Sequence, residues 1–68
     1  MVLRALGKRI RELRAQRGWT QERLAEAATV DRSYLAGIEA GRRNPSVRNL
    51  LKIGNALGVR VRDFFERE

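Results

Sequence analysis

The sequence predicts an all-α fold, a compact bundle of five short helices. Apolar residues recur at three- and four-residue steps over most of the 68-residue chain. No stretch alternates convincingly between apolar and polar residues over the length of a strand. Glycine, proline and helix-capping residues divide the sequence into short segments. A chain of this length is near the lower limit for one hydrophobic core, so we expect residues 1–68 to form a single domain.

The first helix is expected at the start of the chain, where apolar residues share one face: Leu3, Leu6, Ile10 and Leu13. Gly18 is a natural helix stop. Trp19 directly precedes Thr20, a good N-cap residue, and is placed to pack on Leu24 as a hydrophobic staple. The second helix is therefore expected to begin at Gln21.

Residues 21–40 contain an apparent fault in the helical pattern. If they formed one helix, Asp31 would lie in the apolar stripe, where a buried unpaired carboxylate costs several kcal/mol. If Asp31 caps a new helix, it contributes about 1 kcal/mol instead, and Val30 turns inward. We therefore predict helices over 21–28 and 32–40, joined by a tight turn at Thr29-Val30. This is the layout of a helix-turn-helix, which spans about residues 20–40.

The remaining elements follow from local signals. The segment Gly41-Arg42-Arg43-Asn44-Pro45 is a loop because it combines glycine, asparagine and proline. Ser46 is the next N-cap, and Gly58 ends the fourth helix, whose apolar positions are Val47, Leu50, Leu51, Ile53, Ala56 and Leu57. Val61, Phe64 and Phe65 have weak helical spacing and predict a short fifth helix.

Composition narrows the function. A formal net charge of +7 and a pI near 11.5 indicate a polyanionic partner. Cysteine and histidine are absent, so the chain has no thiolate metal sites and lacks both the commonest metal ligand and the commonest general base. We therefore expect a protein that binds no metal or cofactor and is not an enzyme. No apolar run has membrane-spanning length, and the start of the chain has no signal-peptide core, so we expect a cytoplasmic, nucleoid-associated protein.

Residues 20–59, TQERLAEAATVDRSYLAGIEAGRRNPSVRNLLKIGNALGV, closely resemble the helix-turn-helix family of phage Cro and cI repressors, also called the XRE family. Matching features are Thr20-Gln21, Ala25, Val30, Leu35 and Ile38, Glu39 with Gly41, and Asn44-Pro45-Ser46. The resemblance implies a DNA-binding repressor domain of this fold. The segment DRSYLAGIEAGRRNP is most similar to the controller proteins of restriction-modification systems.

Two positions depart from the family pattern. Thr29 occupies a turn position where the family usually has glycine, and a left-handed residue there costs a β-branched side chain about 1–2 kcal/mol. Either Thr29 accepts this strain or the turn has a different shape. Arg60 stands where the family often has a serine or threonine cap, so the fifth helix is expected to be short or frayed.

The resemblance assigns roles to individual side chains. A recognition helix presents its first residues to base edges in the major groove, and the outward candidates here are Arg32, Ser33, Tyr34, Ala36 and Gly37. Arginine is the best reader because its guanidinium pairs with guanine O6 and N7. The phosphate-contact candidates are Gln21, Arg42, Arg43 and Asn44, of which Gln21 is also expected to brace the recognition helix.

Other residues are expected to hold the scaffold together. The family pairs Glu39 with an arginine of the first helix, and Arg14 matches that partner. The expected core contains Trp19, Leu24, Ala25, Leu35, Ile38, Leu50 and Ile53. Because one small module reads few bases, family members bind as two-fold dimers. The C-terminal segment of about residues 57–66 is the expected homodimer interface, through Leu57, Val59, Val61, Phe64 and Phe65. The alternative is that both phenylalanines fold back into the core, or that one does and the other stays at the interface.

The leading hypothesis is therefore a sequence-specific double-stranded DNA-binding transcriptional regulator that acts as a dimer on a palindromic operator. The alternative is an antitoxin-type or other regulator whose main partner is a protein, although little of the chain lies outside the five helices. An enzyme is the third and weakest class, because Ser33 near Asp31 has no histidine beside it. A further hypothesis places the basic first helix on a membrane surface. It does not explain residues 20–59.

Overall fold

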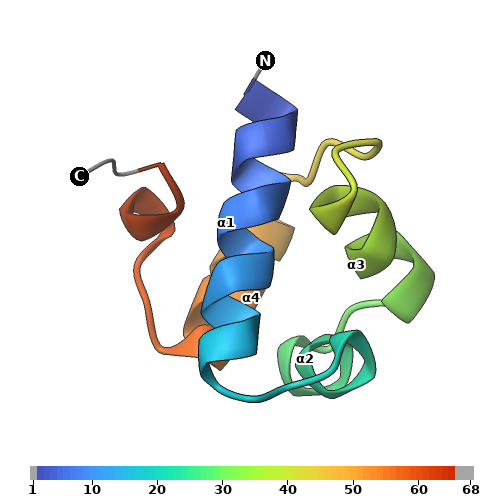
Figure 1. Ribbon diagram of the computed structural model, residues 1–68, viewed down its shortest axis with the longest axis vertical. Helices are drawn as coiled ribbons and strands as arrows, with labels where there is room; N and C mark the ends of the chain where they lie inside the picture. The colour runs from blue at the N-terminus through green and yellow to red at the C-terminus, as the bar shows by residue number, and fades with distance from the viewer. Residues whose placement is uncertain (1, 66–68) are drawn as a thin grey trace.

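The computed structural model describes residues 2–65 of the chain, and side chains from Arg4 onward; the side chain of Leu3 and residue 66 lie outside the described part. This part contains four α-helices and one 3-10 helix: α1 (Val2–Gln16), α2 (Gln21–Ala28), α3 (Arg32–Glu39), α4 (Val47–Leu57) and η1 (Val61–Phe64). Figure 1 shows α1 crossing the molecule, with α2 and α3 to one side, η1 to the other and α4 behind.

The three predicted N-caps are present. The side-chain oxygens of Thr20, Asp31 and Ser46 each accept a hydrogen bond from the backbone N–H three residues later, at 3.0, 3.2 and 3.1 Å. Each bond satisfies one of the four N–H groups that a helix start leaves without a partner. The helices α2, α3 and α4 therefore begin where the sequence predicts, and Asp31 starts a helix rather than interrupting one.

The turn between α2 and α3 is made by Thr29 in the left-handed conformation, at φ 57° and ψ 49°. This conformation lets the backbone N–H of Thr29 bond to the carbonyl of Glu26 and that of Val30 bond to Ala25, at 3.2 and 2.9 Å. These bonds close the carboxyl end of α2 as glycine normally does. Thr29 thus accepts the strained conformation, and Val30 is half-buried against the core.

The core lies where the helices converge. Its buried apolar residues are Leu6, Ile10, Leu24, Ala25, Ala28, Leu35, Ile38, Leu50, Ile53, Leu57 and Phe64, with Trp19 packed partly against them. Gly7 brings α1 close to α3, because a Cβ at this position would overlap the carbonyl oxygens of Ile38 and Glu39. The first helix therefore lies directly on the carboxyl end of α3.

The fifth helix is short, as expected, and it is a single 3-10 turn over Val61–Phe64 rather than a fifth α-helix of the bundle. The carboxylate of Asp63 accepts the backbone N–H of Arg60 at 2.9 Å, and no side-chain cap comes from Arg60 itself. In a 3-10 turn, residues three apart share a face. One turn thus suffices to direct both Val61 and Phe64 toward the core.

Candidate nucleic-acid interface

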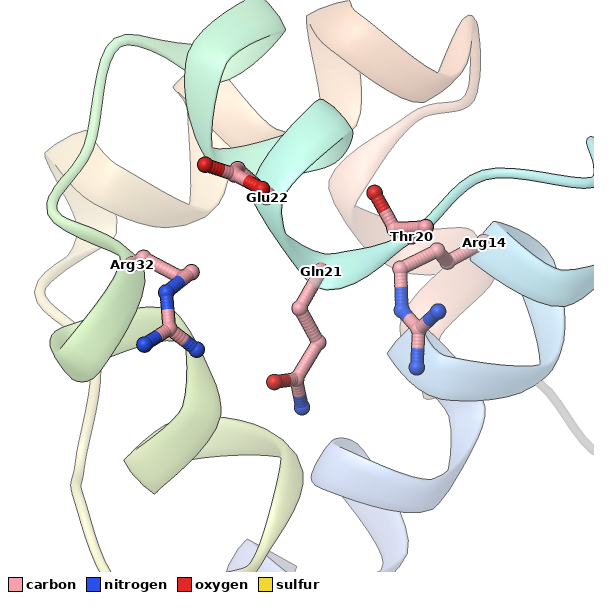
Figure 2. A pocket seen from close by; sticks show the side chains of 5 residues that line it. All are labelled: Arg14, Thr20, Gln21, Glu22 and Arg32. Carbon is pink, nitrogen blue, oxygen red and sulfur yellow. The ribbon is translucent and has the colours of Figure 1, made fainter.

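The beginning of α3 is exposed. Arg32 and Ser33 are both accessible in its first turn, and Ala36 is half-buried one turn further. Figure 2 shows a depression in front of this end of α3, in which Gln21 lies between Arg32 and Arg14. The depression is lined almost entirely by polar side chains, so it suits a hydrated, charged ligand rather than an apolar one.

A partly buried hydrogen-bond network fixes α3 to the two helices before it. The Arg14 guanidinium donates to both carboxylate oxygens of Glu39, at 2.8 and 2.9 Å, and Gln21 Nε2 donates to the same carboxylate at 3.0 Å. Arg14 also donates to the backbone carbonyl of Trp19 at 2.7 Å. The ion pair expected between Arg14 and Glu39 is thus present, and the bracing role expected of Gln21 has a direct geometric basis.

This ion pair belongs to the scaffold. The Glu39 side chain is only 3% exposed and that of Arg14 is 15% exposed, whereas the ion pair between Arg23 and Glu26 is largely solvated, at 55% and 76%. A buried carboxylate requires several partners, and Glu39 has three donors. The network therefore sets the orientation in which α3 presents its first turn.

Tyr34 connects α3 to α4 instead of projecting freely outward. Its half-buried side chain reaches the start of α4, where the hydroxyl accepts hydrogen bonds from Asn49 Nδ2 at 3.0 Å and from the Ser46 N–H at 3.3 Å. The guanidinium of Arg43 lies over the Tyr34 ring, 5.2 Å from its centroid, which is within cation–π range. Sequence reasoning missed Asn49, because its role depends on where α4 begins in space.

The expectation that Gly37 lies on the outward face is wrong. Gly37 is buried, and a Cβ at this position would overlap the side chain of Arg43. Its carbonyl accepts the backbone N–H groups of both Arg42 and Arg43, at 2.9 and 3.1 Å. Gly37 therefore leaves space for the Arg43 side chain, and its carbonyl oxygen accepts the hydrogen bonds that hold the following loop against α3.

The loop after α3 carries exposed polar side chains. Arg42, Arg43 and Asn44 are all solvent-accessible, and Gly41 turns the chain with a φ of 77°. Because the loop is bonded to the Gly37 carbonyl, these side chains stay beside the carboxyl half of α3. The predicted base-contact and phosphate-contact residues are thus on neighbouring elements, apart from the buried Gly37.

The C-terminal segment differs from the expected interface. Leu57 and Phe64 are buried in the core of the chain itself, so their expected place in a dimer interface is wrong. Val59 and Val61 are half-buried against the same core, and only Phe65 of the five is exposed, at 47%. Two further apolar side chains are exposed on α4: Val47 and Leu51 are 72% and 51% accessible and lie one turn apart.

The described residues include no cluster of three or more acidic side chains arranged to hold a metal ion. Among residues 2–65, no helix is both long and apolar enough to cross a membrane. The apolar face of α1, with Leu6 and Ile10, is buried in the core. This burial argues against the membrane-surface hypothesis, which requires an exposed apolar face on that helix.

Comparisons with known proteins identify the fold family. A helix-turn-helix family model matches residues 10–64. The immunity repressor protein of Bacillus phage phi105 is 48% identical over 56 residues, which cover 82% of this chain but only 39% of the phage protein.

Solved structures agree with this match. The restriction-modification controller protein C.AhdI from Aeromonas hydrophila superposes with a TM-score of 0.91 at 46% identity, over 93% of this chain and 96% of that one. SinR of Bacillus subtilis, solved in complex with DNA, superposes with a TM-score of 0.85 at 37% identity, over 90% of this chain and 98% of that one. These relatives are regulators rather than enzymes. The chain belongs to the Cro/cI-type helix-turn-helix family of DNA-binding regulators.

Proposed function

We propose that this protein is a sequence-specific double-stranded DNA-binding transcriptional regulator that acts as a dimer on a palindromic operator. The observation that carries the proposal is the exposed first turn of α3, held in place by the partly buried Arg14–Glu39–Gln21 network. A helix of this kind enters the major groove with its first residues toward the base edges. A preorganised reader loses less conformational entropy on binding than a mobile one.

In this proposal Arg32 is the principal base reader, because its guanidinium forms a bidentate pair with guanine O6 and N7. Ser33 contacts a neighbouring base, and the small side chain of Ala36 lets α3 approach the groove floor. Tyr34 contributes through its ring, which supports Arg43, while its hydroxyl retains one proton for a base or a phosphate.

The phosphate contacts in this proposal come from both sides of α3. Gln21 lies at the start of α2, where free backbone N–H groups favour an anion, and its amide keeps donor capacity after bonding to Glu39. Arg42, Arg43 and Asn44 contact the backbone from the loop after α3. The formal charge of +7 favours such contacts and makes binding strongly dependent on salt.

The proposed dimer uses the exposed apolar side chains of the C-terminal half. Of the five residues expected at the interface, Phe65 is the exposed one. Val47 and Leu51 provide further exposed apolar surface on α4. The similarity to C.AhdI, together with Arg32-Ser33-Tyr34 at the start of α3, supports a controller protein of a restriction-modification system as the specific role.

Selection of bound sequences from random duplex DNA tests the proposal. The expected result is an enriched consensus with two-fold symmetry and half-sites about one helical turn apart. Enrichment of one unrepeated half-site would overturn the dimer, and no enrichment at all would overturn sequence-specific binding. The second outcome would favour a regulator whose main partner is a protein.

A further inference from the structure

Three basic side chains lie in a row on α1, and none of them forms a side-chain hydrogen bond with another described residue. Arg4, Lys8 and Arg11 are spaced four and three residues apart, so they lie on one face of the helix. All three are exposed, and none of them forms an ion pair with another described residue. Glu12 follows Lys8 by four residues and thus borders the row, but its carboxylate is paired with Arg9, at 3.8 Å.

The row lies beside α3 because α1 packs so closely on it. Gly7 lets the backbone of α1 approach the carbonyl groups of Ile38 and Glu39. Arg11 then lines one depression together with Gln21, Ala36 and Ala40. The first helix therefore borders the same surface that carries the proposed contacts to DNA.

The other end of the row borders the loop after α3. Arg4 and Lys8 line a depression with Gly41, and a Cβ at Gly41 would lie 3.2 Å from the Cα of Arg4. Arg42 and Arg43 follow Gly41 directly and are exposed. Basic side chains of α1 and of the loop therefore border the carboxyl half of α3 from two neighbouring elements.

The electrostatics of this surface favour a long anion over a single acidic group. The acid at the carboxyl end of α3, Glu39, is buried and already paired with Arg14, so it does not offset the exposed cations. From Arg4 to Arg11 the α1 row covers seven residue steps, or about 10 Å along the helix axis. A polyanion with regularly spaced charges fits this length, and the sugar-phosphate backbone of DNA is such a polyanion.

We propose that Arg4, Lys8 and Arg11 bind the phosphate backbone of the duplex that α3 reads, beyond the base pairs that α3 contacts. The inference rests on the proposed function, and it adds α1 to the DNA-binding surface. These contacts carry no base information, so they increase affinity and salt dependence while leaving the consensus unchanged.

The test compares two variants that remove the same charge. In the first, Arg4→Gln is combined with Arg11→Gln. In the control, Arg60→Gln is combined with Arg62→Gln, which are exposed and lie at η1, across α1 from α3 (Figure 1). Glutamine resembles arginine in helix propensity, and circular dichroism verifies that both variants fold. Affinity for the selected duplex is measured between 50 and 200 mM salt.

Each lost phosphate contact reduces the slope of log K against log salt by about 0.9. For the α1 variant we expect the slope to be shallower by the amount that corresponds to one or two lost contacts. The decrease in its affinity between the two salt concentrations should then be about 3.5-fold smaller for each lost contact. The slope of the control variant should differ from the wild-type slope by less than half of the change expected for one lost contact. Both variants should select the wild-type consensus.

Equal slopes for the two variants would overturn the proposal that the α1 row binds phosphate. A changed consensus for the α1 variant alone would also overturn it. If the wild-type chain binds its selected duplex while the α1 variant keeps the full slope, only this inference fails. If the wild-type chain binds no duplex, the proposed function fails and the inference fails with it.

Discussion

Arg14 and Glu39 are joined by two hydrogen bonds of 2.8 and 2.9 Å, although they lie 25 residues apart in sequence. The pair connects the carboxyl half of α1 to the last residue of α3. Gln21 donates to the same carboxylate from the start of α2. The orientation of α3 therefore depends on side chains from two other helices, and this dependence can be tested without DNA.

Glu39→Gln should destabilise the protein strongly. The variant leaves the poorly exposed guanidinium of Arg14 without its carboxylate, and breaking a buried pair in this way costs about 3–5 kcal/mol. Glu26→Gln is the matched control, because it breaks the solvated pair with Arg23 and should cost less than about 1 kcal/mol. Urea unfolding followed by circular dichroism measures both. Similar losses in the two variants would contradict a structural role for the partly buried network.

Asp31→Ala should lower stability by about 1 kcal/mol, because α3 loses the cap on the Tyr34 N–H. In a domain of this size the loss corresponds to a decrease in Tm of about 4–8 °C. Asp31→Asn retains an acceptor and should stay close to wild type. An alanine variant as stable as the asparagine variant would show that the cap does not determine where α3 begins.

Thr29→Gly should raise stability. Thr29 has a φ of 57°, a conformation that costs a non-glycine residue about 1–2 kcal/mol of stability. Glycine removes this strain, but it lowers stability by about 0.5–1 kcal/mol because the unfolded chain becomes more flexible. The expected net gain is about 0.5–1 kcal/mol in thermal unfolding. Thr29→Ala keeps the left-handed strain and should gain nothing. A glycine variant less stable than wild type would contradict the strain assigned to this turn.

Tyr34→Phe and Asn49→Ala should show energetic coupling. Each variant removes the hydrogen bond between the Tyr34 hydroxyl and Asn49 Nδ2, so the double variant should lose less than the sum of the single losses. Each single loss should be about 1 kcal/mol, with a coupling of at least about 0.5 kcal/mol. Strict additivity in denaturant unfolding would mean that this bond contributes nothing to the joining of α3 and α4.

Local chemistry explains why most of the fold can be predicted from the sequence. The helix starts at Thr20, Asp31 and Ser46 depend on one side chain and the backbone three residues later, and the stop at Gly18 depends on its own φ of 71°. At Thr29 the sequence leaves two alternatives, a strained left-handed residue or a turn of another shape, because it does not tell whether the surrounding structure compensates for the strain.

The errors concern side chains whose surroundings come from distant parts of the chain. Leu57 and Phe64 are apolar residues near the C-terminal end, and only the packed structure distinguishes core from interface there. Gly37 lies on the expected outer face of α3, but the loop folds back and Arg43 covers it. The placement of Tyr34 against Asn49 likewise requires the position of α4.

Base reading by the first turn of α3 is tested by Arg32→Ala. Affinities of wild type and variant are measured on the selected duplex and on every single base-pair substitution of it. The variant is expected to keep its fold and to lose discrimination at one position of each half-site, by roughly 1–3 kcal/mol, with other positions unchanged. An equal loss of affinity on all sequences would contradict base reading by Arg32.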